Sequence, residues 1–222
     1  MRNRLLAVAC ILLTVPAAFF AVPAAAQDRA RTWDFNAGLQ WSGSLSLDGQ
    51  MGTSLDIDDD LGFKFGGTYN FTNRWALGFG VGWISPRYTA TYLPEAGPPL
   101  ESIRATMDVF SLYAKGTFNF LEGPITPYVE LGAGWTDVDS NIADGPPITG
   151  CWWDPWWGWQ CAPFYSTYGE SLTSWSGAVG LRWDVNRMWG IKASYGITEL
   201  DTSSNTEDAS IDMIAIEAIF RY

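Results

Sequence analysis

The sequence predicts an all-β fold, an eight-stranded antiparallel up-and-down barrel, and three observations point to it. Apolar and polar residues alternate in eight segments, aromatic residues gather at the ends of those segments, and short connections alternate with long ones. After residue 26 no apolar run reaches the length of about 18 residues that a membrane-spanning helix requires. We therefore expect one β domain over residues 27–222.

The alternation is read at every second residue. In the first segment the apolar positions are Trp33, Phe35, Ala37, Leu39 and Trp41. Side chains alternate between the two faces of a strand, so this spacing places them all on one face. The same spacing recurs in residues 61–71, 75–83, 110–120, 129–135, 175–185, 189–197 and 214–222. No charged residue falls in the apolar phase of any segment, so one face of the whole sheet is apolar.

The connections between the segments differ in length on the two sides of the predicted sheet. Residues 72–74, 121–124 and 186–188 form short turns, whereas 43–60, 93–106, 139–171 and 200–210 form long loops. This asymmetry is typical of bacterial outer-membrane barrels. An even number of strands places both termini on the short-turn side, which is periplasmic in such barrels.

The apolar face could point inward, as in a soluble lipocalin-like barrel, or outward into lipid. Trp33 and Trp41, like Trp75 and Trp83, stand at both ends of segments of about nine residues, which fits the two aromatic girdles of a membrane barrel. The outward arrangement is therefore favoured, with charged residues inside. The interior would hold Lys64, Lys115, Arg182, Lys192 and Arg221 with Asp34, Glu130, Asp184 and Glu217. Buried charges must be paired, and eight strands leave little open space, so we expect salt-bridge networks and no open pore.

The first 26 residues have the anatomy of a secretory signal peptide. Arg2 and Arg4 precede the apolar stretch 5–22, and Ala24, Ala25 and Ala26 form a small-residue cleavage site. A membrane anchor is the alternative, which Pro16 and Pro23 disfavour. Removing two arginines leaves 13 − 2 = 11 basic against 24 acidic residues, a charge of −13. That charge excludes nucleic acid as a partner.

Cys151 and Cys161 are the only cysteines beyond the signal, and in an exported chain they predict one disulfide. A metal site is disfavoured because the chain has no histidine. Between the cysteines lie Trp152, Trp153, Trp156, Trp157 and Trp159. This cluster either folds over the barrel mouth or onto its aromatic belt, or it captures a small hydrophobic or glycan ligand. Asp154-Pro155 and Gly158 are expected to break the run into turns.

An enzyme is disfavoured because a catalytic base that titrates near neutral pH is usually histidine, and the chain has none. The acidic run Asp56, Asp58, Asp59 and Asp60 lacks the spacing of a calcium-binding EF-hand loop. We interpret it as a solvated loop and strand end. The alternative is weak Ca²⁺ or Mg²⁺ bridging to lipopolysaccharide phosphates. We expect no cofactor and no resident metal.

Three stretches resemble the small outer-membrane β-barrel proteins of Gram-negative bacteria, a group that includes opacity-like surface antigens, OmpA-type barrels and OmpW. They are residues 108–135 with the pattern PYV-x-x-G-A-G, residues 61–83, and the ending IEAIFRY. The resemblance implies that Phe220 and Tyr222 form the C-terminal signal read by the barrel-assembly machinery. It also implies outer-membrane lipid and lipopolysaccharide as surroundings. We expect a structural or surface-interaction role, with an OmpW-like binder or conduit for small hydrophobic molecules as the alternative.

Overall fold

The computed structural model describes residues 28–48, 52–92, 99–146, 148–164, 166–201 and 209–222. The predicted signal peptide, residues 1–26, lies outside this range and stays a prediction. Among the described residues, no helix is long and apolar enough to cross a membrane.

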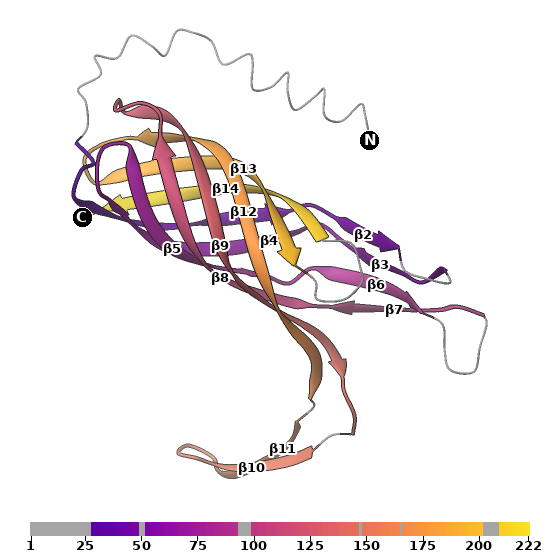
Figure 1. The fold of residues 1–222 in the computed structure, drawn as a ribbon. Helices are drawn as coiled ribbons and strands as arrows, with labels where there is room; N and C mark the ends of the chain where they lie inside the picture. Colours follow the sequence, from indigo (N-terminus) through magenta and orange to yellow (C-terminus); the bar gives the residue numbers. More distant parts are fainter. Residues whose placement is uncertain (1–27, 49–51, 93–98, 147, 165, 202–208) are drawn as a thin grey trace.

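Eight antiparallel strands close into a barrel, as the sequence predicts. The strands are β1 (Thr32–Ser42), β4 (Asp60–Asn70), β5 (Trp75–Ile84), β8 (Asp108–Asn119), β9 (Ile125–Ala143), β12 (Thr167–Asp184), β13 (Trp189–Asp201) and β14 (Ala209–Arg221). Closure occurs between the first and last strands, where Phe35 lies opposite Phe220. Backbone hydrogen bonds between Trp33 and Tyr222 continue this seam to the end of the chain. Figure 1 shows the described chain ends together at the end of the barrel that carries the short turns. We call this the turn side and the opposite end the outer end.

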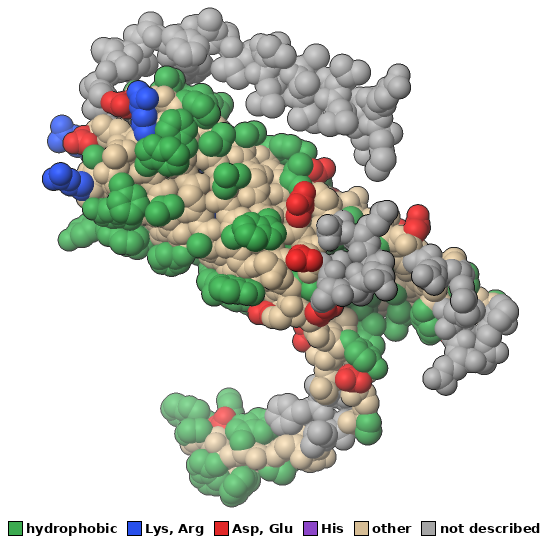
Figure 2. All heavy atoms as spheres, in the orientation of Figure 1, with side chains coloured by type: hydrophobic (Ala, Val, Ile, Leu, Met, Phe, Trp, Pro, Cys, Tyr) green, Lys and Arg blue, Asp and Glu red, His purple; other side chains and the backbone are tan. Residues whose placement is uncertain are grey.

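The apolar side chains point outward and form two aromatic belts. On the turn side, the rings of Trp33 and Tyr69 lie 5.3 Å apart. Those of Trp75 and Phe118 lie 4.7 Å apart. Such cross-strand aromatic pairs stabilise a sheet. The outer belt includes Trp41, Trp83, Trp135 and Trp175, which are between 39% and 64% exposed. Figure 2 shows hydrophobic side chains over the barrel wall between these levels.

The expected loops 43–60 and 93–106, together with residues 87–92 before the second loop, contain strands of a second sheet. The sheet has the order β2-β3-β6-β7, formed by β2 (Leu45–Asp48), β3 (Ser54–Ile57), β6 (Arg87–Tyr92) and β7 (Glu101–Thr106). It extends beyond the outer end of the barrel (Figure 1). Tyr88 on β6 is buried and its hydroxyl donates a 3.0 Å hydrogen bond to the carbonyl oxygen of Ser140 on β9. We predicted no strands over 43–60 and 93–106, although the strands there do alternate. Their apolar residues share one face of the sheet: Leu45, Leu47, Leu55, Ile57, Tyr88, Ala90, Ile103 and Ala105. Each strand has only four to six residues, so each gives a much shorter pattern than a barrel strand.

The expected loop 139–171 is also largely β structure. β9 and β12 continue past the outer belt as a two-stranded ribbon, and β10 (Ile148–Asp154) and β11 (Gly158–Phe164) form a hairpin beyond it. The turn at residues 155–157 falls where Asp154-Pro155 and Gly158 predict one. The residues on either side of this turn form paired strands, which we did not predict. Ladder hydrogen bonds satisfy their backbone groups outside the barrel.

Candidate functional site

The interior charges of the barrel form two clusters at different heights. The turn-side cluster joins two arginines to two aspartates. Arg182 donates to Asp34 at 2.7 Å and to Asp184 at 3.0 Å. Arg221 donates to the same carboxylates at 2.9 Å and 2.8 Å. All four side chains are buried. The cluster thus closes a ring of charge-assisted hydrogen bonds across the barrel.

Arg29 completes this cluster, and sequence reasoning missed it. Its side chain is fully buried, and Nε donates to Asp184 at 2.5 Å. The other guanidinium nitrogens donate to the carbonyl oxygens of Leu121 and Gly123 in the turn between β8 and β9. The Arg29 backbone N–H donates to the side chain of Asn73, in the turn between β4 and β5, at 2.8 Å. The segment before β1 therefore ties two turns together and closes the turn side. Because it precedes the first alternating segment, no periodic pattern marks it.

The central cluster lies nearer the middle of the strands and joins three lysines to two glutamates. Lys115 and Lys192 approach the same Glu130 oxygen at 3.4 Å and 3.5 Å. Lys64 approaches Glu217 at 3.4 Å. These charges are mostly or fully buried, and pairing offsets part of the large cost of removing them from water. The structure thus brings all nine interior residues named from the sequence into ion pairs.

Two tyrosines fill space beside the central cluster. Lys64 lies 5.8 Å from the ring centroid of Tyr113, and Lys192 lies 4.7 Å from that of Tyr128. Gly80 makes room for the first ring, because a Cβ atom there would lie 2.5 Å from Tyr113. These contacts add cation–π attraction to the ion pairs. Together they form a floor across the barrel.

A cavity lies on the outer side of this floor. Its volume is about 120 Å³, and Lys64, Tyr113 and Glu130 contribute to its lining. The remaining lining is mixed, with Gln40, Thr136 and Met213 among others. Pockets for drug-sized ligands usually enclose about 300–1,000 Å³. The volume suits a few waters better than a large solute.

The predicted disulfide is present at the centre of the β10–β11 hairpin. Cys151 lies opposite Cys161 in the ladder, and their sulfur atoms are bonded. Trp153 lies opposite Trp159, with the two rings edge to face and 6.1 Å apart. The ladder and the disulfide therefore hold this tryptophan pair in a fixed register.

The hairpin turn is held by Asp154. Its Oδ1 accepts hydrogen bonds from the backbone N–H groups of Trp156 at 2.7 Å and Trp157 at 3.0 Å. Gly158 follows with φ +72°, a left-handed conformation that glycine adopts without strain. The Gln160 side-chain amide donates to the carbonyl oxygen of Trp157 at 2.8 Å. The turn thus uses the polar side chains around it and directs its tryptophans outward.

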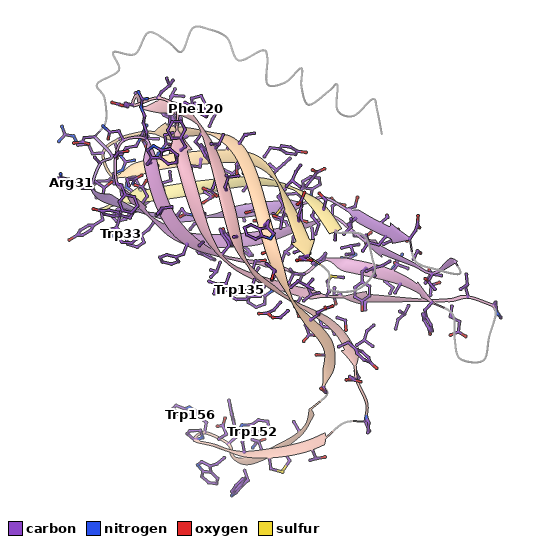
Figure 3. All side chains as sticks on the ribbon, in the orientation of Figure 1. Arg31, Trp33, Phe120, Trp135, Trp152 and Trp156 are labelled. Atoms are coloured by element: carbon purple, nitrogen blue, oxygen red, sulfur yellow. A yellow bond between two sulfur atoms is a disulfide. The ribbon has the colours of Figure 1, made fainter. Side chains whose placement is uncertain are left out.

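The hairpin tryptophans are exposed. Their exposed fractions are 43% for Trp152, 62% for Trp153, 86% for Trp156, 75% for Trp157 and 70% for Trp159. Figure 3 shows Trp152 and Trp156 away from the barrel wall. In this structure the hairpin neither caps the barrel mouth nor packs against the outer belt.

The acidic run lies at the outer end of the barrel. Asp59 accepts a 3.1 Å hydrogen bond from the indole N–H of Trp41, and Asp60 accepts one of 3.2 Å from the backbone of Ser85. Asp56 belongs to β3, and Asp58 follows that strand. Within the described part of the chain, no three potential metal-ligating side chains gather.

The predicted C-terminal signal residues lie on the turn side. Phe220 faces outward against Trp189, with ring centroids 5.1 Å apart. Tyr222 is 86% exposed. Both side chains are therefore accessible from the lipid side or the turn side of the barrel.

Comparison with known proteins identifies the architecture. Residues 12–221 match the family described as the outer membrane protein beta-barrel domain. No curated protein matches the sequence. Among solved structures, the chain is similar to outer membrane protein OprG of Pseudomonas aeruginosa, with a TM-score of 0.56 and 12% identity. The alignment covers 87% of this chain and 96% of OprG.

Two further solved structures share the fold at low sequence identity. Neisserial surface protein A aligns with a TM-score of 0.52 and 10% identity, over 86% of this chain and 97% of that protein. Ail of Yersinia pestis, solved with the heparin analogue sucrose octasulfate, aligns with a TM-score of 0.50 and 18% identity. That alignment covers 87% of this chain and 99% of Ail. At such identities the likeness concerns the fold alone.

Proposed function

The chain belongs to the outer membrane protein β-barrel domain family and lies in the Gram-negative outer membrane, and from this premise we propose a non-enzymatic structural role. In this proposal the barrel is a closed plug that strengthens the envelope. Its disulfide-closed tryptophan hairpin supplies a contact with the surroundings.

The observation that carries this proposal is the filled interior. The two charge clusters and Arg29 cross the barrel at successive heights, and the cavity of about 120 Å³ has the central cluster in its lining. Opening a path would separate buried ion pairs and leave charged side chains without partners inside the barrel, which is unfavourable. Solute flow through the barrel is therefore not its role.

Catalysis is not part of the proposal. The sequence contains no histidine, and the interior carboxylates are engaged with lysine and arginine side chains. A carboxylate held in such pairs stays ionised and is a poor general base. These features support a role in structure and contact.

The alternative role is a binder or conduit for small hydrophobic molecules. Its support is the exposed tryptophan hairpin, which could hold an apolar solute. The barrel gives such a solute no continuation, because the cavity is small and its lining includes charged side chains. A sulfated sugar is also a poor partner, since Asp137, Asp139, Asp144 and Glu170 flank the hairpin.

The two roles predict opposite signs in one experiment. Cells that lack the protein should take up more of a hydrophobic dye if the barrel strengthens the envelope, and less if it conducts such solutes. Wild-type protein supplied from a plasmid should restore the original rate. Purified protein in a planar bilayer should show conductance near zero. A large stable pore, or lower dye uptake by the deletion cells, would overturn the proposal.

A further inference from the structure

The direction of the β10–β11 hairpin separates it from the other outer segments. The β2-β3-β6-β7 sheet continues away from the barrel, whereas the hairpin turns back alongside it (Figure 1). Its tip points toward the turn side, and Figure 3 shows Trp156 at this tip, clear of the barrel wall. Trp135 belongs to the outer aromatic belt, which marks the outer interface of the membrane. The tip therefore points back toward the membrane level instead of away from it.

The chemistry of the hairpin suits a neutral interface. Residues 148–164 contain no lysine or arginine, and their one acidic side chain, Asp154, accepts hydrogen bonds from the turn. Gln160 also donates to the turn. Trp156 and Trp157 are the most exposed of the five tryptophans. Tryptophan combines an apolar ring with one N–H donor and concentrates where lipid headgroups meet acyl chains.

We propose that the hairpin is a lateral anchor: Trp156 and Trp157 insert into the outer leaflet of the same membrane that holds the barrel. The disulfide and the Trp153–Trp159 pair keep the hairpin in one register, so that both tip side chains enter together. The anchor extends the interface that the outer belt already forms with lipid. It deepens the proposed structural role and rests on it.

Two other occupants fit less well. Protein sites for sugars combine ring stacking with polar side chains that are free to bind hydroxyl groups, and here Asp154 and Gln160 serve the turn. A second, facing membrane would require a tip that points away from the barrel, as the β2-β3-β6-β7 sheet does. The backward direction of the hairpin favours the membrane of the barrel itself.

The test measures the depth of the individual indoles. Protein labelled with fluorotryptophan is placed in phosphatidylcholine vesicles, with and without lipopolysaccharide, and studied by fluorine NMR. Single Trp156→Phe, Trp157→Phe and Trp135→Phe variants assign the three signals. A nitroxide near the glycerol end of a lipid acyl chain should broaden the tip signals as strongly as that of Trp135. A water-soluble nickel chelate should leave all three sharp.

A double variant, Trp156→Ser with Trp157→Ser, provides a second readout. If the tip lies in lipid, iodide quenches the total tryptophan fluorescence of the variant in vesicles at least as strongly as that of the wild type, because the variant has lost only shielded indoles. If the tip lies in water, the wild type has a strongly quenched fraction that the variant lacks. The matched control replaces Tyr92 and Ile103 of the β6–β7 ribbon with serine, and we expect it to leave the quenching unchanged.

Broadening of the tip signals by the nickel chelate, in both vesicle types, would overturn the anchor. That result would leave the dye-uptake and conductance outcomes untouched, because those measure the barrel. Conversely, a conducting pore would end the proposed structural role even if the tip signals report lipid. If the nitroxide lipid broadens the tip signals only in vesicles that contain lipopolysaccharide, the result would support the anchor and assign it to that glycolipid.

Discussion

The two ends of the barrel use the same strands for opposite purposes. On the turn side, Arg29, Arg182 and Arg221 converge on Asp184, and short turns close over them. At the outer end the strands open onto a cavity and continue as exposed ribbons. One end is held by buried charge, and the other presents surface. The comparison suggests that stability is concentrated on the turn side, whereas contact with the surroundings is concentrated at the outer end.

The largest expected effect comes from removing the shared acid of the turn side. Asp184→Ala leaves three buried guanidinium groups with only Asp34 as a carboxylate partner, and breaking such pairs typically costs about 3–5 kcal/mol. Urea unfolding of the protein in vesicles should show this loss. Asp48→Asn, at an exposed position of β2, is the matched control and should change nothing measurable. Equal effects of the two variants would contradict the contrast between the ends.

The second prediction concerns Arg29. Arg29→Ala removes hydrogen bonds to Asp184 and to two turn carbonyls, and a hydrogen bond to a charged group typically contributes about 1.5–3 kcal/mol. We expect a loss of that size in the same unfolding measurement. Arg31→Ala changes a neighbouring exposed arginine and should be nearly neutral. If both variants unfold alike, the segment before β1 does not lock the turn side.

The barrel is predictable from the sequence because lipid constrains it at every second residue. A charged side chain in the outward phase would face lipid, so the alternation from Trp33 to Tyr222 stays uninterrupted in all eight strands. The interior phase also predicts contacts, since lysine and glutamate side chains inside a closed barrel must form ion pairs with each other. The Lys115–Glu130 contact at 3.4 Å follows from that requirement.

The outer ribbons are not predictable in this way. In β6, Tyr88, Ala90 and Tyr92 alternate with polar residues, but the strand has only six residues, so its pattern is shorter than that of a membrane-spanning strand. Arg29 was missed for a different reason. It precedes the first alternating segment, and only the fold brings it near Asp184 and the carbonyl oxygens of the turns. The stretch CWWDPWWGWQC predicts the disulfide and the tryptophan cluster of the hairpin. The backward direction of the hairpin depends instead on the β9–β12 ribbon that carries it.

The third prediction separates the hairpin from the barrel. Replacing Cys151 and Cys161 with serine removes a closure that contributes about 2–3 kcal/mol by loop-entropy arguments. Because the hairpin stands apart from the barrel, we expect the unfolding midpoint of the barrel to stay unchanged. The hairpin itself should become sensitive to chymotrypsin, which cleaves after aromatic residues. A lower barrel midpoint would show that the two regions are coupled.

The smallest expected effect concerns the β6–β7 strand pair of the second sheet. The Tyr92 hydroxyl donates a 3.1 Å hydrogen bond to Glu101, and this bond, together with the negative charge of the carboxylate, raises the pKa of Tyr92 above its ordinary value. Because the folded pKa is raised, the contact stabilises the ribbon below the ordinary tyrosine pKa and is lost as pH rises through the raised value. Ultraviolet difference titration of wild type and Tyr92→Phe should isolate this tyrosine at alkaline pH. Glu101→Gln should return its pKa to the ordinary range, while the far-ultraviolet signal of the barrel stays constant over the same titration, since the pair is exposed at the edge of the ribbon.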